Sequence, residues 1–389
     1  MILAIAFSLT TAMARAVAVS PRVVQARERV HEQSALLAAA RASASPALTA
    51  NYAQSPQAGN DNNTIAQRLI TVGGQVTLGD YWSYSPAIRQ AQSQLQAAEL
   101  DLLSAQRAER TRASDLYFAA LRSAATLRLR NEQLAGAKSD LRAAELRFHA
   151  GDAPRLDVVR AQVSMARAEG DRNAAATDLA NARYALRVEL NAPSVELAAA
   201  PPVRIAGDPQ TLANRALAQR SDLASAEQAV AGEAAAVALA QRSSLPAVVV
   251  NAGYTAGTDS GIAVRGPSAN VLLIFPLSRG ALQRAEAERA RLAQAHAKAD
   301  AIRLQISVEV ANAARTYDET ARAAAIAARA RIAAQQELNA TELGYRSGAS
   351  SSLDVADARR TYAQAALDEL AAIYARAEAA AALEEALGP

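Results

Sequence analysis

The sequence predicts a mainly α-helical protein with a small β part, built from long coiled-coil hairpins and four amphipathic strands. Two observations carry this prediction. About a quarter of the 389 residues are Ala and 4% are aromatic, a composition typical of closely packed helices. The chain also repeats itself: Gly151 and Gly348 stand 197 residues apart, and the same shift aligns Leu-Asp-Val at 156–158 with Leu-Asp-Val at 353–355. A period of about half the chain indicates a duplicated unit rather than a short solenoid repeat.

Each half is predicted to contain a helix, two strands, a very long helix, a glycine turn and a second long helix. Alanines and leucines recur in the long segments at three- and four-residue spacing, the period of a helix that packs along one face. A helix of this length, about 100 Å at 1.5 Å per residue, needs partners along its whole extent, which favours coiled-coil pairing. We expect the elements of the first half at 9–43, 46–54, 67–78, 86–148 and 155–190, and those of the second at 209–243, 246–256, 268–277, 279–345 and 352–387.

The predicted strands alternate strictly between apolar and polar residues. Such alternation over nine to eleven residues fits a tilted strand that crosses a membrane. Tyr81, Trp82 and Tyr84 follow the second strand, where an aromatic belt at the membrane interface would lie. The alternative is that the strands form two hairpins packed on a soluble core.

Four strands in a membrane cannot stand alone, because they cannot close a barrel and open sheet edges are not tolerated in lipid. Several chains must therefore pool their strands. Two chains would give an eight-stranded barrel filled by its own side chains, whereas three would give twelve strands and room for a passage. The polar loops at 55–63 and 257–267 would face outward. A conduit therefore favours at least a trimer.

The domain organisation follows from the repeat. We assign residues 9–190 to the first structural repeat, 191–208 to a Pro-rich linker and 209–389 to the second repeat. Residues 1–8 are interpreted as the remnant of an export signal, since they are apolar but carry no basic segment. Leu9–Ser20 aligns with Gln210–Ser221, which places residues from Leu9 onward in the mature fold. Cleavage after Ala16 is the alternative.

Composition excludes several classes of function. The chain has no Cys and therefore no disulfide or thiolate metal site. It has no run of eighteen apolar residues that would predict a membrane-spanning helix. A net charge of +3 gives little support to nucleic-acid binding. The three His residues are widely separated, and no phosphate loop or paired acid–base motif is present. We therefore predict no enzyme activity, metal or cofactor.

The order of elements from Leu9 to Gly388, and the turn motif Tyr345-Arg-Ser-Gly348 followed by Leu353-Asp-Val355, resemble the TolC-like family of outer membrane efflux proteins. The resemblance implies a homotrimer with a twelve-stranded β-barrel in the outer membrane and a periplasmic α-barrel of twelve helices. It also implies a passive channel that docks with a periplasmic adaptor (membrane fusion) protein and an inner-membrane pump. A periplasmic coiled-coil adaptor, or a structural coiled-coil protein without a pore, remains the alternative.

The resemblance also implies roles for individual residues. The turns at Gly151 and Gly348 would form the periplasmic tip and contact the adaptor, and Asp157 and Tyr345 would link the two hairpins in the closed state. The position where some relatives carry Arg, two residues after the second glycine, is Ser350 here. Carboxylates that would line the pore constriction are those of Asp354 and Asp357.

Local helix chemistry offers a competing explanation for several of these residues. Ser351-Ser-Leu-Asp354 fits a capping box, and Asp157 occupies the same place in the other repeat, so a cap would account for both. Asp357 corresponds to Arg160, so a shared structural need does not account for it, and it is the better pore candidate. Both glycines fit helix C-caps with positive φ. Arginines near the turns, namely Arg155, Arg160, Arg346, Arg359 and Arg360, are interpreted as a solvated face.

Overall fold

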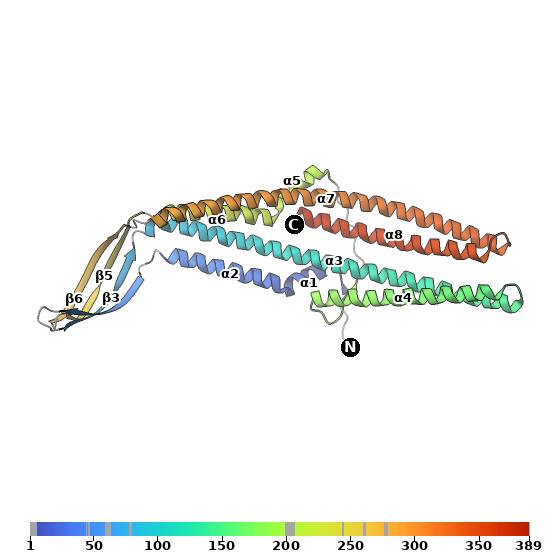
Figure 1. Cartoon of the computed structure of the whole chain (residues 1–389), viewed down its shortest axis with the longest axis horizontal. Coiled ribbons are helices and arrows are strands. Elements are labelled where there is room, and N and C mark those ends of the chain that lie inside the picture. The colour runs from blue at the N-terminus through green and yellow to red at the C-terminus, as the bar shows by residue number, and fades with distance from the viewer. Residues whose placement is uncertain are drawn as a thin grey trace. The chain divides into compact units, whose positions relative to one another are not determined.

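The computed structural model describes residues 6–43, 45, 47–58, 64–77, 80–198, 207–242, 245–259, 262–275 and 279–388, and a few side chains at strand and helix ends within these ranges are not described. The predicted fold class is confirmed: both halves contain the same elements in the same order (Figure 1). The first half contains α1 (Leu9–Val19), α2 (Pro21–Ala42), β2 (Ala47–Ala58), β3 (Thr64–Thr77), α3 (Asp80–Ala150) and α4 (Arg155–Glu189). The second contains α5 (Pro209–Gln219), α6 (Ser221–Arg242), β5 (Ala247–Asp259), β6 (Ile262–Ile274), α7 (Arg279–Arg346) and α8 (Ser352–Leu387).

The first predicted helix of each half is broken into two. Ser20 has extended backbone angles, as expected for a residue before a proline, and α2 starts at Pro21. The second break, at Arg220, has no proline. Arg220 is instead buried, and its guanidinium lies 2.8 Å from Glu309. In the structure α1 begins at Leu9 and α5 begins 200 residues later, at Pro209. The alignment that pairs Leu9 with Gln210 is therefore wrong by one residue.

Two short strands join segments outside the predicted elements. β1 (Ala6–Phe7) pairs in parallel with β4 (Glu196–Leu197), which lies in the predicted linker. Residues 6–7, at the end of the segment interpreted as an export-signal remnant, therefore take part in the described fold. Residues 199–206 of the predicted linker and residues 1–5 lie outside the described part of the chain.

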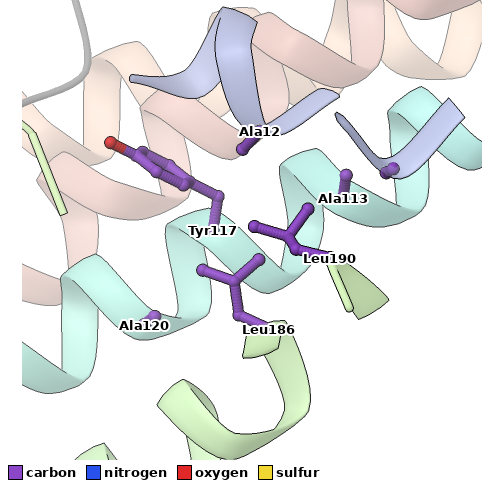
Figure 2. Close-up of a cluster of buried hydrophobic side chains, with 7 residues drawn as sticks. Ala12, Ala113, Tyr117, Ala120, Leu186 and Leu190 are labelled. Atoms are coloured by element: carbon purple, nitrogen blue, oxygen red, sulfur yellow. The ribbon is translucent and has the colours of Figure 1, made fainter. Parts of the chain in front are cut away.

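The chain forms two compact units, each assembled from several segments. The first comprises Met1–Val24, Ser104–Arg220 and Leu304–Pro389, and the second comprises Gln25–Leu103 and Ser221–Arg303. In the first unit, α1, α3 and α4 meet in a buried cluster around Tyr117 (Figure 2). The small side chains in this cluster let the helices approach closely, and the Tyr117 hydroxyl donates a 2.6 Å hydrogen bond to the Ala198 carbonyl. The other cluster members are Ala12, Ala16, Ala113, Ala120, Leu186 and Leu190.

The second unit holds a four-stranded antiparallel sheet in the order β2-β3-β5-β6. Its strands run further than predicted: residues 55–58, 257–259 and 262–267 of the supposed loops are strand, while residues 59–63 and 260–261 lie outside the described part of the chain. The β5–β6 ladder continues to the pair Asp259 and Ile262. Pro56 and Pro267 fall on the two edge strands, where a missing N–H is tolerated.

The long helix α3 begins at Asp80, six residues earlier than predicted, and contains Pro86. A proline this close to the helix start removes few backbone hydrogen bonds. Tyr81, Trp82 and Tyr84 therefore lie in the first turns of α3 rather than ahead of it. The Tyr84 hydroxyl donates to the Arg41 carbonyl over 3.1 Å, and the side chains of Tyr81 and Trp82 lie outside the description. Among the described helices, none combines the length and apolar character needed to cross a membrane.

Two neighbouring carboxyl groups of the first unit, those of Glu109 and Glu189, are buried and partly buried, respectively. Glu109 is 3% exposed and lies 3.3 Å from Arg22, and Glu189 lies 2.9 Å from Arg112. Burial, followed by the neighbouring Glu109 carboxyl group, raises the pKa of Glu189, while Arg112 opposes the shift.

The raised pKa of Glu189 predicts that acid stabilises this unit. The folded chain binds the proton more tightly than the unfolded chain, so this contribution is complete below the ordinary pKa of 4.5 and is lost as the pH rises through the raised value. We expect urea unfolding to show a lower stability at pH 7.5 than at pH 5, and Glu189→Gln to flatten this dependence. Glu337→Gln, on an exposed carboxylate of α7, is the control. An unchanged slope in Glu189→Gln would contradict the assignment.

Candidate functional site: the two helical hairpin turns

The turns between α3 and α4 and between α7 and α8 are the same structure used twice. Gly151 and Gly348 have φ values of +83° and +78°. In the first turn Gly151 N–H donates to Phe148 and Asp152 N–H to Arg147, and the second turn repeats this pattern. These are the two bonds of a Schellman C-cap, so the cap prediction is confirmed. An added Cβ would meet nothing within 4 Å at either glycine, so the backbone conformation alone requires Gly here.

Asp354 forms the predicted capping box at the start of α8. Its Oδ2 accepts from the Ser351 N–H over 2.8 Å, while the Asp354 N–H donates to Ser351 Oγ over 3.2 Å. The hydrogen bond from the Ser351 backbone, together with that from its side chain, lowers the pKa of the exposed Asp354 carboxyl group. The cap accounts for Asp354 at this position, and its predicted role in the pore constriction stays a prediction.

The same explanation is wrong for Asp157. The N-cap of α4 is Pro154, whose side chain has no oxygen that could accept a hydrogen bond, and no side-chain cap forms. The Asp157 carboxylate instead accepts a 2.9 Å hydrogen bond from Ser352 Oγ, at the start of α8, and lies 3.7 Å from Arg160. Asp157 thus connects the α3–α4 hairpin to the α7–α8 hairpin.

Tyr345 provides a second connection between the hairpins. The Arg147 guanidinium, at the end of α3, lies 4.9 Å from the centroid of the Tyr345 ring in a cation–π contact. Ser350 belongs to its own turn: its N–H donates to the Gly344 carbonyl over 3.2 Å, and its hydroxyl lies against Gly344. The structure thus gives both Asp157 and Tyr345 partners on the opposite hairpin, and their role in a closed state stays a prediction.

Arg359 makes a third connection, which the sequence did not reveal. Its guanidinium donates to Glu342 of α7 over 2.7 Å and forms an ion pair with Asp140 of α3. Burial lowers the pKa of this guanidinium. The interpretation of Arg359 as part of a solvated face is therefore wrong. Glu342 and Arg359 carry opposite charges on the two helices of one hairpin, at similar distances from the turn, and this pattern in the sequence could have indicated their ion pair. No local sequence pattern indicates Asp140 as a partner.

Asp357 lies on the exposed surface of α8. Its carboxylate accepts a 2.8 Å hydrogen bond from Arg360, one turn further along the helix, and the two side chains are 56% and 70% exposed. An exposed pair of this kind contributes at most about 1 kcal/mol to stability. The pore-lining role of Asp357 stays a prediction.

The sheet of the second unit has one apolar face, and an opposite face on which polar residues gather on β2, β3 and β5. Thr71 and Thr255 hydroxyls lie 3.0 Å apart, and Thr255 donates to Ser268 over 3.0 Å, which places hydroxyls in a row across three strands. The apolar face exposes large apolar side chains, including Leu48, Tyr52, Ile70, Val72, Tyr254, Val271 and Leu273. The predicted alternation therefore holds best on β2, β3 and β5, whereas β6 exposes apolar side chains on both faces, with Ile262, Val264, Leu272 and Ile274 on the polar one.

Comparison with known proteins agrees with this architecture. A model of the outer membrane efflux protein family matches residues 12–192 and 212–389, nearly the whole chain. The chain belongs to this family. Membership in the outer membrane efflux protein family places the chain in a class of channels rather than of enzymes. No curated protein matches the chain in sequence.

Solved channels share the fold of this outer membrane efflux protein. The outer-membrane channel OprN superposes with a TM-score of 0.85 at 20% identity, over 98% of this chain and 89% of OprN. CmeC of Campylobacter jejuni gives 0.84 at 16% identity, over 98% and 85% of the two chains. MtrE of Neisseria gonorrhoeae, in its open state, gives 0.82 at 20% identity, over 98% and 88%.

Proposed function

We propose that the protein is a passive exit duct of a tripartite efflux or secretion system, which crosses the outer membrane, extends through the periplasm and opens at the two hairpin turns. The observation that carries this proposal is the set of links between the hairpins: Arg147 with Tyr345, Asp157 with Ser352, and Arg359 with Asp140. All of them are non-covalent and polar, so a docking partner can exchange them for its own contacts. Their loss would free one hairpin to move away from the other.

The sheet supports assembly of several copies. β2 and β6 are its edges, and each has a row of backbone groups without a ladder partner among the described strands. Three copies would close a twelve-stranded barrel with the apolar face toward lipid and the Thr71–Thr255–Ser268 row toward the passage. The remaining partners would be a periplasmic adaptor at the turns and an inner-membrane pump that supplies the transport energy.

Membrane fractionation tests this proposal against the two other classes of protein. We expect the full-length protein to be recovered with the outer membrane as a trimer that dissociates on heating. A periplasmic adaptor would fractionate with the inner membrane or the periplasm, and a structural coiled coil without a pore would be soluble. Recovery in either of those fractions, from cells that export the chain, would contradict the proposal.

Replacement of Asp357 tests whether α8 lines the constriction. In a trimer, Asp357→Ala removes three carboxylates and leaves three Arg360 guanidinium groups without their partners, so the local potential becomes more positive. We expect the ratio of K⁺ to Cl⁻ permeability in planar bilayers to fall roughly two- to threefold. Asp318→Ala, on an exposed carboxylate of α7, is the control. Equal selectivity in wild type and Asp357→Ala would remove Asp357 from the constriction.

A further inference from the structure

The apolar face of the sheet ends in a row of polar side chains near the hairpin ends. Counted from the helix end, the first polar side chains on this face are Gln54, Arg68, Thr258 and Arg265, one on each strand. The register places Gln54, Arg68 and Thr258 side by side, while Arg265 stands beside Ala256 in the adjacent row. The boundary is therefore at nearly the same height on all four strands.

Arg68 and Arg265 are both exposed at this boundary, and their positions bring them close together. They lie on the same face with one strand, β5, between them, and their rows are two residues apart. With strands about 4.8 Å apart and a rise of about 3.3 Å per residue, their Cα atoms are roughly 12 Å apart. Two flexible side chains at this separation can reach a single headgroup.

Neither arginine has a carboxylate partner among the described residues. Asp259 is the one acidic residue in the described strands β2, β3, β5 and β6, and the two-residue alternation places it on the opposite face. Tyr52 and Tyr254 lie on the arginine face just toward the helix end and are 61% and 55% exposed. Tyrosines at the edge of an apolar face, followed by cations, are the arrangement of a membrane interface.

Lipid phosphate is the partner that this chemistry fits. Arg presents a planar fork of donors that binds phosphate oxygens in pairs. The inference rests on the proposed function, because the apolar face meets lipid only if the sheet forms part of a membrane barrel. In that case the apolar residues lie in the hydrocarbon and the two arginines at the headgroups of the leaflet that the hairpin ends face. We propose that Arg68 and Arg265 bind the phosphate groups of lipid headgroups in that leaflet.

Titration with a defined lipid tests this site. Diphosphoryl lipid A is added to the purified full-length protein in detergent, and the bound lipid is counted by native mass spectrometry. We expect the affinity to fall about tenfold in R68Q/R265Q, since each lost charge-assisted hydrogen bond to phosphate is a strong one. The control R27Q/R29Q removes the same charge from two exposed arginines of α2 and is expected to leave the affinity unchanged. Equal affinity in R68Q/R265Q and wild type would overturn the proposal.

Additional measurements show whether the bound phosphate must belong to a lipid, and whether a loss of binding comes from misfolding. Inorganic phosphate alone, if it binds as tightly as the lipid, would overturn the assignment to a membrane lipid. If R68Q/R265Q does not fold, the single variants R68Q and R265Q decide in its place, each with an expected intermediate loss. Conductance is recorded in parallel. A protein that conducts but binds lipid equally in all variants overturns this inference alone, whereas a folded trimer that binds lipid but never conducts overturns the proposed function alone.

Discussion

Replacement of Arg359 by Glu is expected to raise the single-channel conductance several-fold. Arg359 holds α8 against Asp140 of the other hairpin and Glu342 of its own. The variant places a third carboxylate between these two, and like charges at such distances repel by about 4 kcal/mol in a partly solvated setting. The three carboxylates can separate only if the hairpins move apart, so the loss of stability, on the order of 2 kcal/mol, should accompany opening of the turns.

A charge reversal at another arginine near the turns shows whether the effect is specific to Arg359 or follows from any change of charge. Arg155→Glu makes the same change on an exposed arginine at the start of α4 that has no ion pair among the described residues. It is expected to leave conductance within the wild-type range. The double variant Arg359→Glu with Asp140→Arg restores opposite charges across the hairpins and should recover part of the closed behaviour. Equal opening by Arg155→Glu would show that Arg359 has no particular role.

Truncation of Tyr117 is expected to cause the largest loss of stability in the first unit. Its ring is fully buried among α1, α3 and α4 (Figure 2). Its hydroxyl donates a hydrogen bond to the Ala198 carbonyl. Tyr117→Ala should reduce the free energy of unfolding by about 3–5 kcal/mol, as is usual for an aromatic side chain removed from a core. Tyr117→Phe keeps the ring and should cost about 1 kcal/mol for the lost hydrogen bond.

An exposed tyrosine provides the control for this loss. Tyr184 is 59% exposed on α4, and the Arg187 guanidinium lies 5.1 Å from the centroid of its ring. Tyr184→Ala should therefore change the free energy of unfolding by less than about 0.5 kcal/mol. All variants are compared by urea unfolding at one pH. If Tyr117→Ala were as mild as Tyr184→Ala, the cluster in Figure 2 would not be the core of this unit.

Features that depend on neighbouring residues in the chain were predictable from the sequence. The glycine turns and the capping box of Asp354 follow from local rules, in which Gly adopts positive φ and Ser and Asp satisfy free N–H groups at a helix start. For Asp157 the same local rule led to a wrong prediction. Its alignment with Asp354 suggested the same cap, although Pro154, visible in the sequence, cannot provide one.

Features that depend on the other hairpin or on tertiary burial were not predictable. Pro21 signals the break between α1 and α2, but the equivalent break at Arg220 depends on its burial and on the ion pair with Glu309. Arg359 resembled other surface arginines in the sequence, because its partner Asp140 belongs to a distant segment of the chain.

Single-channel recording of the purified wild-type protein tests the central claim most directly. If the chain is an exit duct held closed by its hairpin links, a folded trimer in a planar bilayer will give discrete conductance steps, small in the wild type and larger in Arg359→Glu. If trimers that are folded by circular dichroism give no steps, and Arg359→Glu is equally silent, the chain does not form a conduit.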